Sequence, residues 1–296
     1  MRPAGEPHRR LRPTAAERGV VLVVPAVLAA ALLHASWNAV AHAIPDRRVG
    51  FFLLNAGISA VSLPLLPFVG VPAAKAWPFL LGSVVVHLCY NLLLLRSYQL
   101  GDFGQTYPLA RGTAPLVVAL VAATVVGQPL DAREVAGVLT VSAGLVVLVL
   151  GGGRFTASRA AVVAALTTGL AIATYTVLDG VGVRRADGVA AYVAWLFALQ
   201  GPLIAGILGA RRRGLVPASR RLLAPGLASG VVSVAAYGLV VWAQSRGRLA
   251  TVASLREVSI VFGAVIGALF FHERFGAARV VGAVTVFTGV LVLAAA

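Results

Sequence analysis

Residues 249–271 read LATVASLREVSIVFGAVIGALFF. The stretch is long enough for a helix to cross the hydrocarbon core of a bilayer, which takes about 20 residues. Two opposite charges, Arg256 and Glu257, lie within it. A charged side chain at such a depth costs at least about 2.5 kcal/mol and therefore tends to mark a functional site. We expect one continuous membrane helix with a polar site near its start.

A second copy of this pattern lies earlier in the chain. Residues 111–150 align with residues 256–295 at a constant shift of 145 without a gap, and Arg111 falls on Arg256. Two glycine pairs also match, Gly137 with Gly282 and Gly144 with Gly289. The chain therefore contains one unit used twice.

The composition places both copies in a membrane. Of the 296 residues 59% are hydrophobic and only 12% are charged, and the mean hydropathy is +0.91. This leaves too little polar surface to coat a soluble protein of this size. The net charge of +15 comes from arginines in the N-terminal tail and between apolar runs, so we expect membrane-flanking charge and no nucleic-acid partner. The single cysteine, Cys89, excludes an intrachain disulfide and a cysteine metal cluster.

Ten apolar segments follow a basic tail. Most approach or exceed the length of a membrane helix, and none alternates polar with apolar residues as a barrel strand does. We expect residues 1–19 to be a disordered tail. The predicted helices are 20–44, 51–70, 77–95, 106–126, 135–150, 160–178, 189–208, 222–242, 249–271 and 280–296.

The odd number of helices in each copy determines how the two are related. A first repeat over 20–150 and a second over 160–296 each hold five helices, so the second enters the bilayer from the opposite side. The predicted fold is an all-α membrane protein of ten transmembrane helices in two inverted five-helix repeats, the plan of many alternating-access carriers. Equal numbers of Lys and Arg flank the two sides, so the loop charges leave the orientation tied. The arginine-rich tail before the first helix favours both termini inside.

Arg111 and Arg256 are the main candidates for substrate contacts. Each lies several residues inside its helix, where a guanidinium must meet water, a carboxylate or a substrate anion. The planar guanidinium suits a carboxylate or a phosphate. In the alternative interpretation, Arg256 pairs with Glu257 or with an acid of another helix and only locks the bundle.

Pro115 adds a backbone feature to the helix of Arg111. It follows Arg111 by four residues, and its ring denies the Arg111 carbonyl the usual hydrogen bond. We expect a kink there, or a proline that the membrane helix tolerates.

Two further groups of polar and aromatic residues complete the predicted site. His34 and Asn38 share a helix face, with Trp37 beside them, and would supply a titratable group, an amide and an aromatic wall. His34 could instead be a satisfied core histidine. Tyr90 and Tyr237 occupy related positions in the two repeats and could line a shared cavity.

Asp179 is the remaining acid inside an apolar segment. It lies near the end of its helix, close to Arg184 and Arg185. We interpret it as one half of an ion pair at the membrane interface.

Four segments of the sequence carry a joint signature: LHASWNA at 33–39, GDFGQTYPLARGTAP at 101–115, LREVS at 255–259 and FHERF at 271–275. Together they resemble the EamA-type members of the drug/metabolite transporter superfamily. The resemblance spans nearly all of residues 20–296. It implies two five-helix repeats, a central cavity lined mainly by helices one, three, four, six, eight and nine, cytoplasmic termini, and transport of small metabolites by alternating access. One departure is Gln128, where the family often has glutamate, which leaves the role of a loop acid open in the first repeat.

We therefore expect a secondary carrier of the inner membrane for a small organic solute, such as an amino acid or another anionic or zwitterionic metabolite. Glu257 and His34 are the candidates for proton coupling. The sequence has no phosphate loop, no metal-spaced ligand set and no nucleophile elbow, so we expect no enzyme, cofactor or metal. Two alternatives stay open, a carrier-like sensor or scaffold and a membrane enzyme acting on lipid-linked substrates. The partners we expect are a small-molecule substrate and the lipid bilayer. A second copy of the chain, forming a homodimer, is a possible further partner.

Overall fold

The computed structural model describes residues 22–42, 44, 46–100, 103–150, 157–210, 222–270 and 276–296. Within these ranges every regular element is a helix, which confirms the all-α prediction. The predicted disordered tail, residues 1–19, lies outside the described residues.

The helices follow the predicted segments closely, with one exception. The stretch 249–271, expected as one helix, forms two, α10 and α11, and this corrects the sequence-based prediction. A short 3₁₀ helix, η1 (Ala74–Ala76), precedes α4. The α-helices are α2 (Val23–His42), α3 (Arg47–Val69), α4 (Trp77–Leu100), α5 (Phe103–Thr124), α6 (Ala132–Leu150), α7 (Arg159–Val183), α8 (Val189–Ala210), α9 (Leu223–Arg246), α10 (Leu249–Arg256), α11 (Val258–Phe270) and α12 (Ala277–Ala294).

Seven helical segments of the described chain are long and apolar enough to cross a membrane. They correspond to α2, α3, α4, α7, α8, α9 and α12. In α5 only Leu109–Thr124 is apolar, which is short for a span. The division into α10 and α11 leaves neither half long enough by itself. The number of ten spans is therefore a prediction, whereas a multi-pass arrangement follows from the seven.

Short polar residues fix several helix ends. Asp46 caps α3 by accepting hydrogen bonds from the backbone N–H groups of Arg48 (2.9 Å) and Val49 (3.4 Å). At the start of α6, Asp131 and Glu134 each accept from the other's backbone N–H, at 2.8 and 3.0 Å. These reciprocal bonds form a capping box, which satisfies backbone donors that the first turn leaves free.

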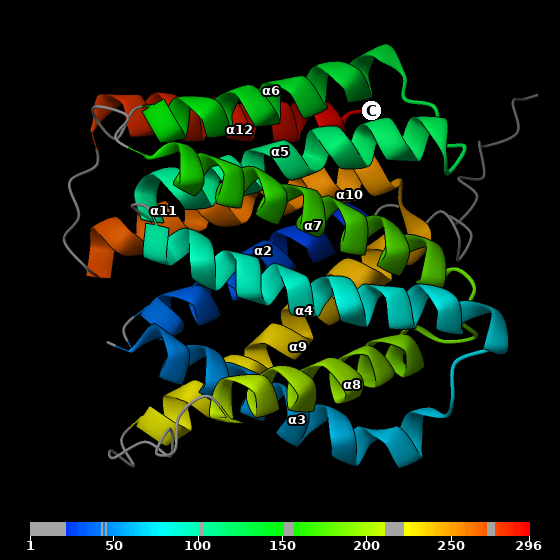
Figure 1. The fold of residues 1–296 in the computed structure, drawn as a ribbon. Coiled ribbons are helices and arrows are strands. Elements are labelled where there is room, and N and C mark those ends of the chain that lie inside the picture. The colour runs from blue at the N-terminus through cyan, green and yellow to red at the C-terminus, as the bar shows by residue number, and fades with distance from the viewer. Residues whose placement is uncertain are drawn as a thin grey trace, which may run out of the picture.

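The helices pack in pairs that join the two halves of the chain. Figure 1 shows α6 beside α12 at one side of the bundle and α3 near α8 at the other. Between them α4 packs on α7, and α2 packs on α9. The short α10 contacts α2, α5, α6 and α9, so the broken segment lies at the centre of the bundle.

Glycines let α6 and α12 approach closely. A Cβ atom added to Gly144 would lie 2.6 Å from the Val286 nitrogen and 2.9 Å from the Gly282 oxygen. One added to Gly289 would lie 2.7 Å from the Val141 nitrogen. The glycines that matched in the sequence alignment thus contact each other's helices, and small residues at such positions allow two membrane helices to pack backbone against backbone.

Replacing Gly144 by leucine is expected to lower the free energy of unfolding by about 1–3 kcal/mol, because the added side chain would clash with the backbone of α12. Thermal unfolding of the purified protein measures the loss. Gly206→Leu on α8 is the matched control, since a Cβ there meets nothing within 4 Å. Equal unfolding temperatures for the two variants would show that α6 and α12 are not packed as described.

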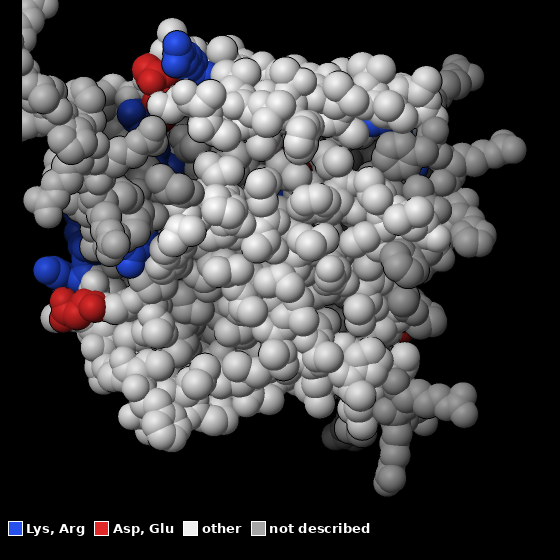
Figure 2. Space-filling model, turned by 180° about the vertical axis from the view of Figure 1, so that it is seen from behind, with Lys and Arg blue, Asp and Glu red and all other residues white. Residues whose placement is uncertain are grey.

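The outer surface of the bundle is apolar. Large hydrophobic side chains stand exposed on many helices, among them Phe68, Leu120 and Leu269. Figure 2 shows a broad face on which charged side chains are sparse, while Lys, Arg, Asp and Glu gather along one edge. An exposed apolar area of this extent suits lipid rather than water.

Candidate functional site

The candidate site is built around the break between α10 and α11. At the break the N–H of Glu257 donates to the Ser254 oxygen at 3.1 Å, and the N–H of Ile260 donates to the Glu257 oxygen at 3.0 Å. These are three-residue turns, tighter than the four-residue turns of an α-helix. The interrupted ladder leaves the Arg256 carbonyl available to a side chain from another helix.

Arg111 of α5 binds this break. Its Nε donates to Glu257 Oε2 at 2.8 Å, and its second terminal nitrogen donates to Ser259 Oγ at 3.2 Å and to the Arg256 carbonyl at 3.5 Å. The side chains of Arg111 and Glu257 are only 2% and 3% exposed. The alternative interpretation, in which Arg256 pairs with Glu257, does not hold, because Arg111 forms that ion pair instead.

Arg256 has no carboxylate partner among the described residues. Its guanidinium donates weakly to Thr176 Oγ1 and to the Tyr175 hydroxyl, both at 3.5 Å, and lies 5.7 Å from the centre of the Tyr237 ring. The residue is only 6% exposed. A buried guanidinium normally has an ionised or strongly accepting partner, so this one has capacity for another acceptor.

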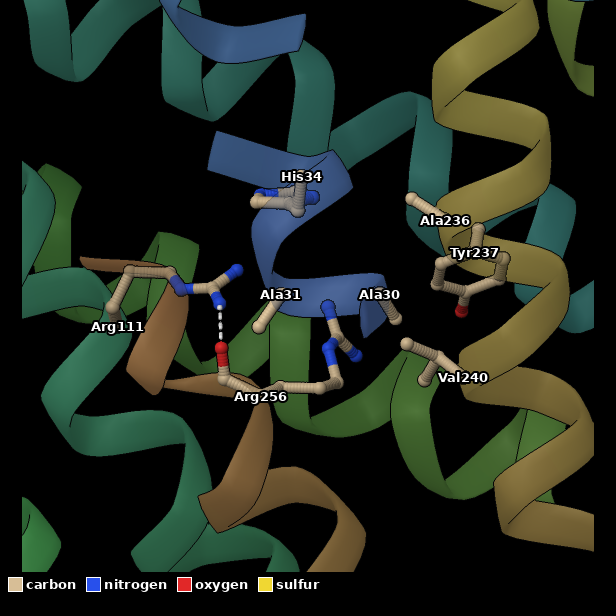
Figure 3. Close-up of a pocket in the computed structure, with 8 residues that line it drawn as sticks. All are labelled: Ala30, Ala31, His34, Arg111, Ala236, Tyr237, Val240 and Arg256. Carbon is tan, nitrogen blue, oxygen red and sulfur yellow. Dashed lines mark hydrogen bonds between the residues drawn. The ribbon is translucent and has the colours of Figure 1, made fainter. Parts of the chain in front are cut away.

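The two arginines meet in a small pocket. Figure 3 shows both guanidinium groups pointing toward the space below His34. The walls leave about 240 Å³ between them, the mouth included, and the inner space is about the size of a water molecule. The lining residues come from α2, α5, α9 and α10: Ala30, Ala31, His34, Arg111, Ala236, Tyr237, Val240 and Arg256.

The other residues predicted on α2 lie beside the pocket rather than in it. Trp37 packs edge-on against His34, with ring centres 5.0 Å apart, and its buried Nε1 has no hydrogen-bond partner. The Asn38 amide donates to the His34 carbonyl at 2.8 Å. That bond holds the Asn38 amide against its own helix. The residues that line the pocket do not include Asn38, so its contact with the substrate stays a prediction.

The two repeat-related tyrosines join one aromatic cluster. His87 of α4 stacks on Tyr175 of α7, with ring centres 4.0 Å apart, and Tyr90 and Tyr237 pack edge-on against Tyr175. Only Tyr237 of this pair belongs to the pocket lining. His87 and Tyr175 were not among the predicted residues, since nothing in their spacing relates α4 to α7.

Asp179 lies behind Tyr237 and is fully buried. It accepts hydrogen bonds from the Tyr192 hydroxyl, at 3.0 Å, and from the Tyr237 hydroxyl. The predicted ion pair with Arg184 or Arg185 is wrong, because Arg184 donates instead to the carbonyls of Gln244 and Gly247. Partial burial lowers the pKa of Arg184 from its ordinary value.

The loop between α5 and α6 holds the start of α10. The Gln128 side-chain oxygen accepts from the Leu249 N–H at 3.0 Å. Arg248 pairs with Glu134 at 2.7 Å and also donates to the Pro129 carbonyl. An amide oxygen thus satisfies a free backbone donor of α10, and the loop needs no acid at position 128 for this contact.

Within the described ranges no three His, Cys, Asp or Glu side chains lie close enough together to hold a metal ion. The pocket lining offers two guanidinium groups, an imidazole, a phenol and apolar walls.

Residues 159–295 match the model of the EamA-like transporter family. A protein of known crystal structure shares the fold at 20% sequence identity with a TM-score of 0.74, over 93% of this chain and 97% of that one. No curated protein matches the sequence.

Proposed function

Since residues 159–295 match the EamA-like transporter family, a family of the drug/metabolite transporter superfamily, we propose that the chain carries a small organic anion or zwitterion across the inner membrane by alternating access. Protons are the proposed coupling ion. The family match and the seven apolar helices support a multi-pass membrane transporter, and the substrate class is inferred from the pocket.

The observation that carries this proposal is the state of Arg256. Its guanidinium is buried, lines the pocket and lacks a carboxylate partner in the described chain. A carboxylate or phosphate of a substrate would supply two acceptor oxygens in the plane of the guanidinium. Arg111 also lines the pocket, but its guanidinium is already paired with the Glu257 carboxylate. Arg256 is therefore the proposed substrate contact, and Arg111 the residue that positions the break.

Contacts between helices support the proposed inverted repeats, residues 20–150 and 160–296. A twofold operation that exchanges the repeats maps the α6–α12 and α3–α8 contacts onto themselves. The same operation exchanges the α4–α7 contact with the α2–α9 contact, and all four are present. Two such halves can rock against each other around a fixed central site.

The small size of the pocket supports a transport cycle with at least one further state in which the pocket is wider. Its inner space is about that of a water molecule, so a metabolite enters only when the surrounding helices separate. We propose that α10 and α11, already divided at Glu257, move apart from α2 and α9 at that step. Half-helices around a central site are common in carriers.

The orientation with both termini in the cytoplasm completes the proposal. Exposed arginines lie in the connections after α7 and α9, where Arg184 binds the end of α9 and Arg248 pairs with Glu134 at the start of α6. Because the Lys and Arg residues that flank the two sides are equal in number, the proposed orientation rests on the arginine-rich tail before the first helix, which favours the cytoplasm.

A thermal-shift screen of the detergent-purified protein tests the function. Amino acids, organic acids, nucleosides, sugars and cationic drugs are each added to the protein and to the Arg256→Ala variant. An acidic or zwitterionic compound at 100 times its dissociation constant is expected to add about 2.7 kcal/mol of stability to the unaltered protein only.

Other outcomes of the screen would contradict the proposal in distinct ways. Stabilisation by cationic drugs alone, retained in Arg256→Ala, would overturn the assignment of an anion site. A folded protein that no class stabilises would favour the sensor or scaffold, and turnover of a lipid-linked compound without any gradient would favour an enzyme.

A further inference from the structure

We propose that Asp179 is the proton-binding site of this carrier and that Tyr237 couples it to the substrate pocket. The inference rests on the proposed transport function and names its coupling residue. Asp179 was assigned to an interface ion pair from the sequence, and the pocket lining does not include it.

The surroundings of Asp179 are those of a buried carboxyl group held by neutral donors. The residue is 0% exposed. Its two oxygens are divided between two helices, with Oδ1 accepting from Tyr192 of α8 and Oδ2 from Tyr237 of α9. Neither donor carries a charge, and no Lys or Arg in the described chain forms an ion pair with Asp179. An acid inside a membrane protein without a paired cation is typical of proton pathways.

Titratable and charged groups approach Asp179 from four helices besides its own. Ser83 and His87 lie on α4, Tyr192 on α8, Tyr237 on α9 and Arg256 on α10. His87 contacts the Tyr237 ring, with ring centres 5.6 Å apart. On α7 itself, Tyr175 lies one turn from Asp179 and reaches Arg256. Arg256 is the cation whose charge acts on Asp179, and it lies 5.7 Å from the centre of the Tyr237 ring.

This arrangement links the proton to the substrate in two ways. An ionised Asp179 accepts from Tyr237, whereas a proton on Oδ2 makes that oxygen a donor and forces the Tyr237 hydroxyl to turn its hydrogen elsewhere. Tyr237 lines the pocket, so the turn changes the wall that a substrate meets. The ionised carboxylate also offsets part of the Arg256 charge, and its protonation leaves that charge to a bound anion.

Glu257, the acid favoured from the sequence, is less suited to this role. Its carboxylate pairs with Arg111 at 2.8 Å and shares that guanidinium with Ser259 and the helix break. Protonating Glu257 would leave Arg111 buried without its ion pair, which is costly. Asp179 can gain or lose a proton without breaking an ion pair of the described chain.

Infrared difference spectroscopy on the purified protein tests the proposal without a substrate, because the proton itself is the probe. Raising the pH is expected to remove one carbonyl-stretching band of a buried, protonated carboxyl group. The band should be absent in Asp179→Asn. It should persist in Asp187→Asn, the matched control, since Asp187 is exposed on the connection after α7.

Tyr192→Phe provides a second test in a protein that keeps the carboxyl group. Loss of one hydrogen bond to Asp179 should shift the frequency of the band without removing it. A band that survives in Asp179→Asn, or that disappears in Glu257→Gln instead, would overturn the proposal. A spectrum with no titrating band in the unaltered protein would do the same. None of these outcomes depends on the thermal-shift screen, so the proton site and the anion site are tested independently of each other.

Discussion

Replacing Arg111 by leucine is expected to lower the free energy of unfolding by about 3–5 kcal/mol, the usual cost of removing one partner of a buried ion pair. The variant leaves the Glu257 carboxylate without its cation at 3% exposure. It also removes the donors to Ser259 and to the Arg256 carbonyl, so the break between α10 and α11 loses its contact with α5. Unfolding of the detergent-purified protein by a denaturant measures the change.

Two further variants make this result specific. Arg111→Leu combined with Glu257→Leu should recover most of the loss, since replacing both partners of a buried pair by apolar residues is often neutral. Arg133→Leu is the matched control, because Arg133 is exposed in the first turn of α6. Should Arg111→Leu unfold no more readily than Arg133→Leu, the ion pair does not stabilise the break.

Replacing Arg256 by lysine is expected to weaken binding of a carboxylate substrate about tenfold to a hundredfold, while the unfolding temperature changes little. Lysine keeps the positive charge but cannot present two parallel donors to one carboxylate. A hydrogen bond to a charged group contributes about 1.5–3 kcal/mol, which corresponds to that range. The affinity of the acidic compound found in the thermal-shift screen provides the measurement.

Arg133→Lys is again the control, as an exposed arginine outside the pocket. Equal affinity of the Arg256→Lys variant and the unaltered protein would remove the two-donor contact from the proposal. Strong unfolding of the variant would instead give Arg256 a structural role, like that of Arg111.

The sequence predicts the helices and both arginines because local signals carry them. Apolar runs of membrane length predict α2 to α9, and the shift of 145 residues relates Arg111 to Arg256. The sequence cannot show which arginine binds Glu257. Arg256 is its neighbour in the chain, yet successive residues on a helix point in different directions, and the partner comes from 146 residues away.

The break between α10 and α11 could not be predicted from the sequence for a related reason. Helix interruptions are expected at proline or glycine, and the sequence offers Pro115 in α5. There α5 continues without interruption from Phe103 to Thr124. The interruption lies at Glu257, where no such residue occurs, and tertiary contacts with Arg111 stabilise it. A break of this kind leaves no local pattern.

Asp179 is another residue whose contacts could not be predicted from the sequence. Its position near two arginines favoured an ion pair, which local sequence makes the simplest interpretation. In the folded chain α7 turns the carboxyl group inward to Tyr192 and Tyr237, while Arg184 satisfies the carbonyls at the end of α9. The contacts of both residues depend on how α7, α8 and α9 pack.

The distance along the chain between Arg111 and Glu257 also has a consequence during synthesis. A ribosome adds about 5–20 residues each second, so roughly 7–30 seconds separate the appearance of the two side chains. In the predicted arrangement of ten spans, α5 carries throughout this interval an arginine whose carboxylate does not yet exist, at a cost of about 2.5–3.5 kcal/mol inside a bilayer. In that arrangement the nascent first half is an unfinished unit, and α5 reaches its final stability only when α10 and α11 leave the ribosome.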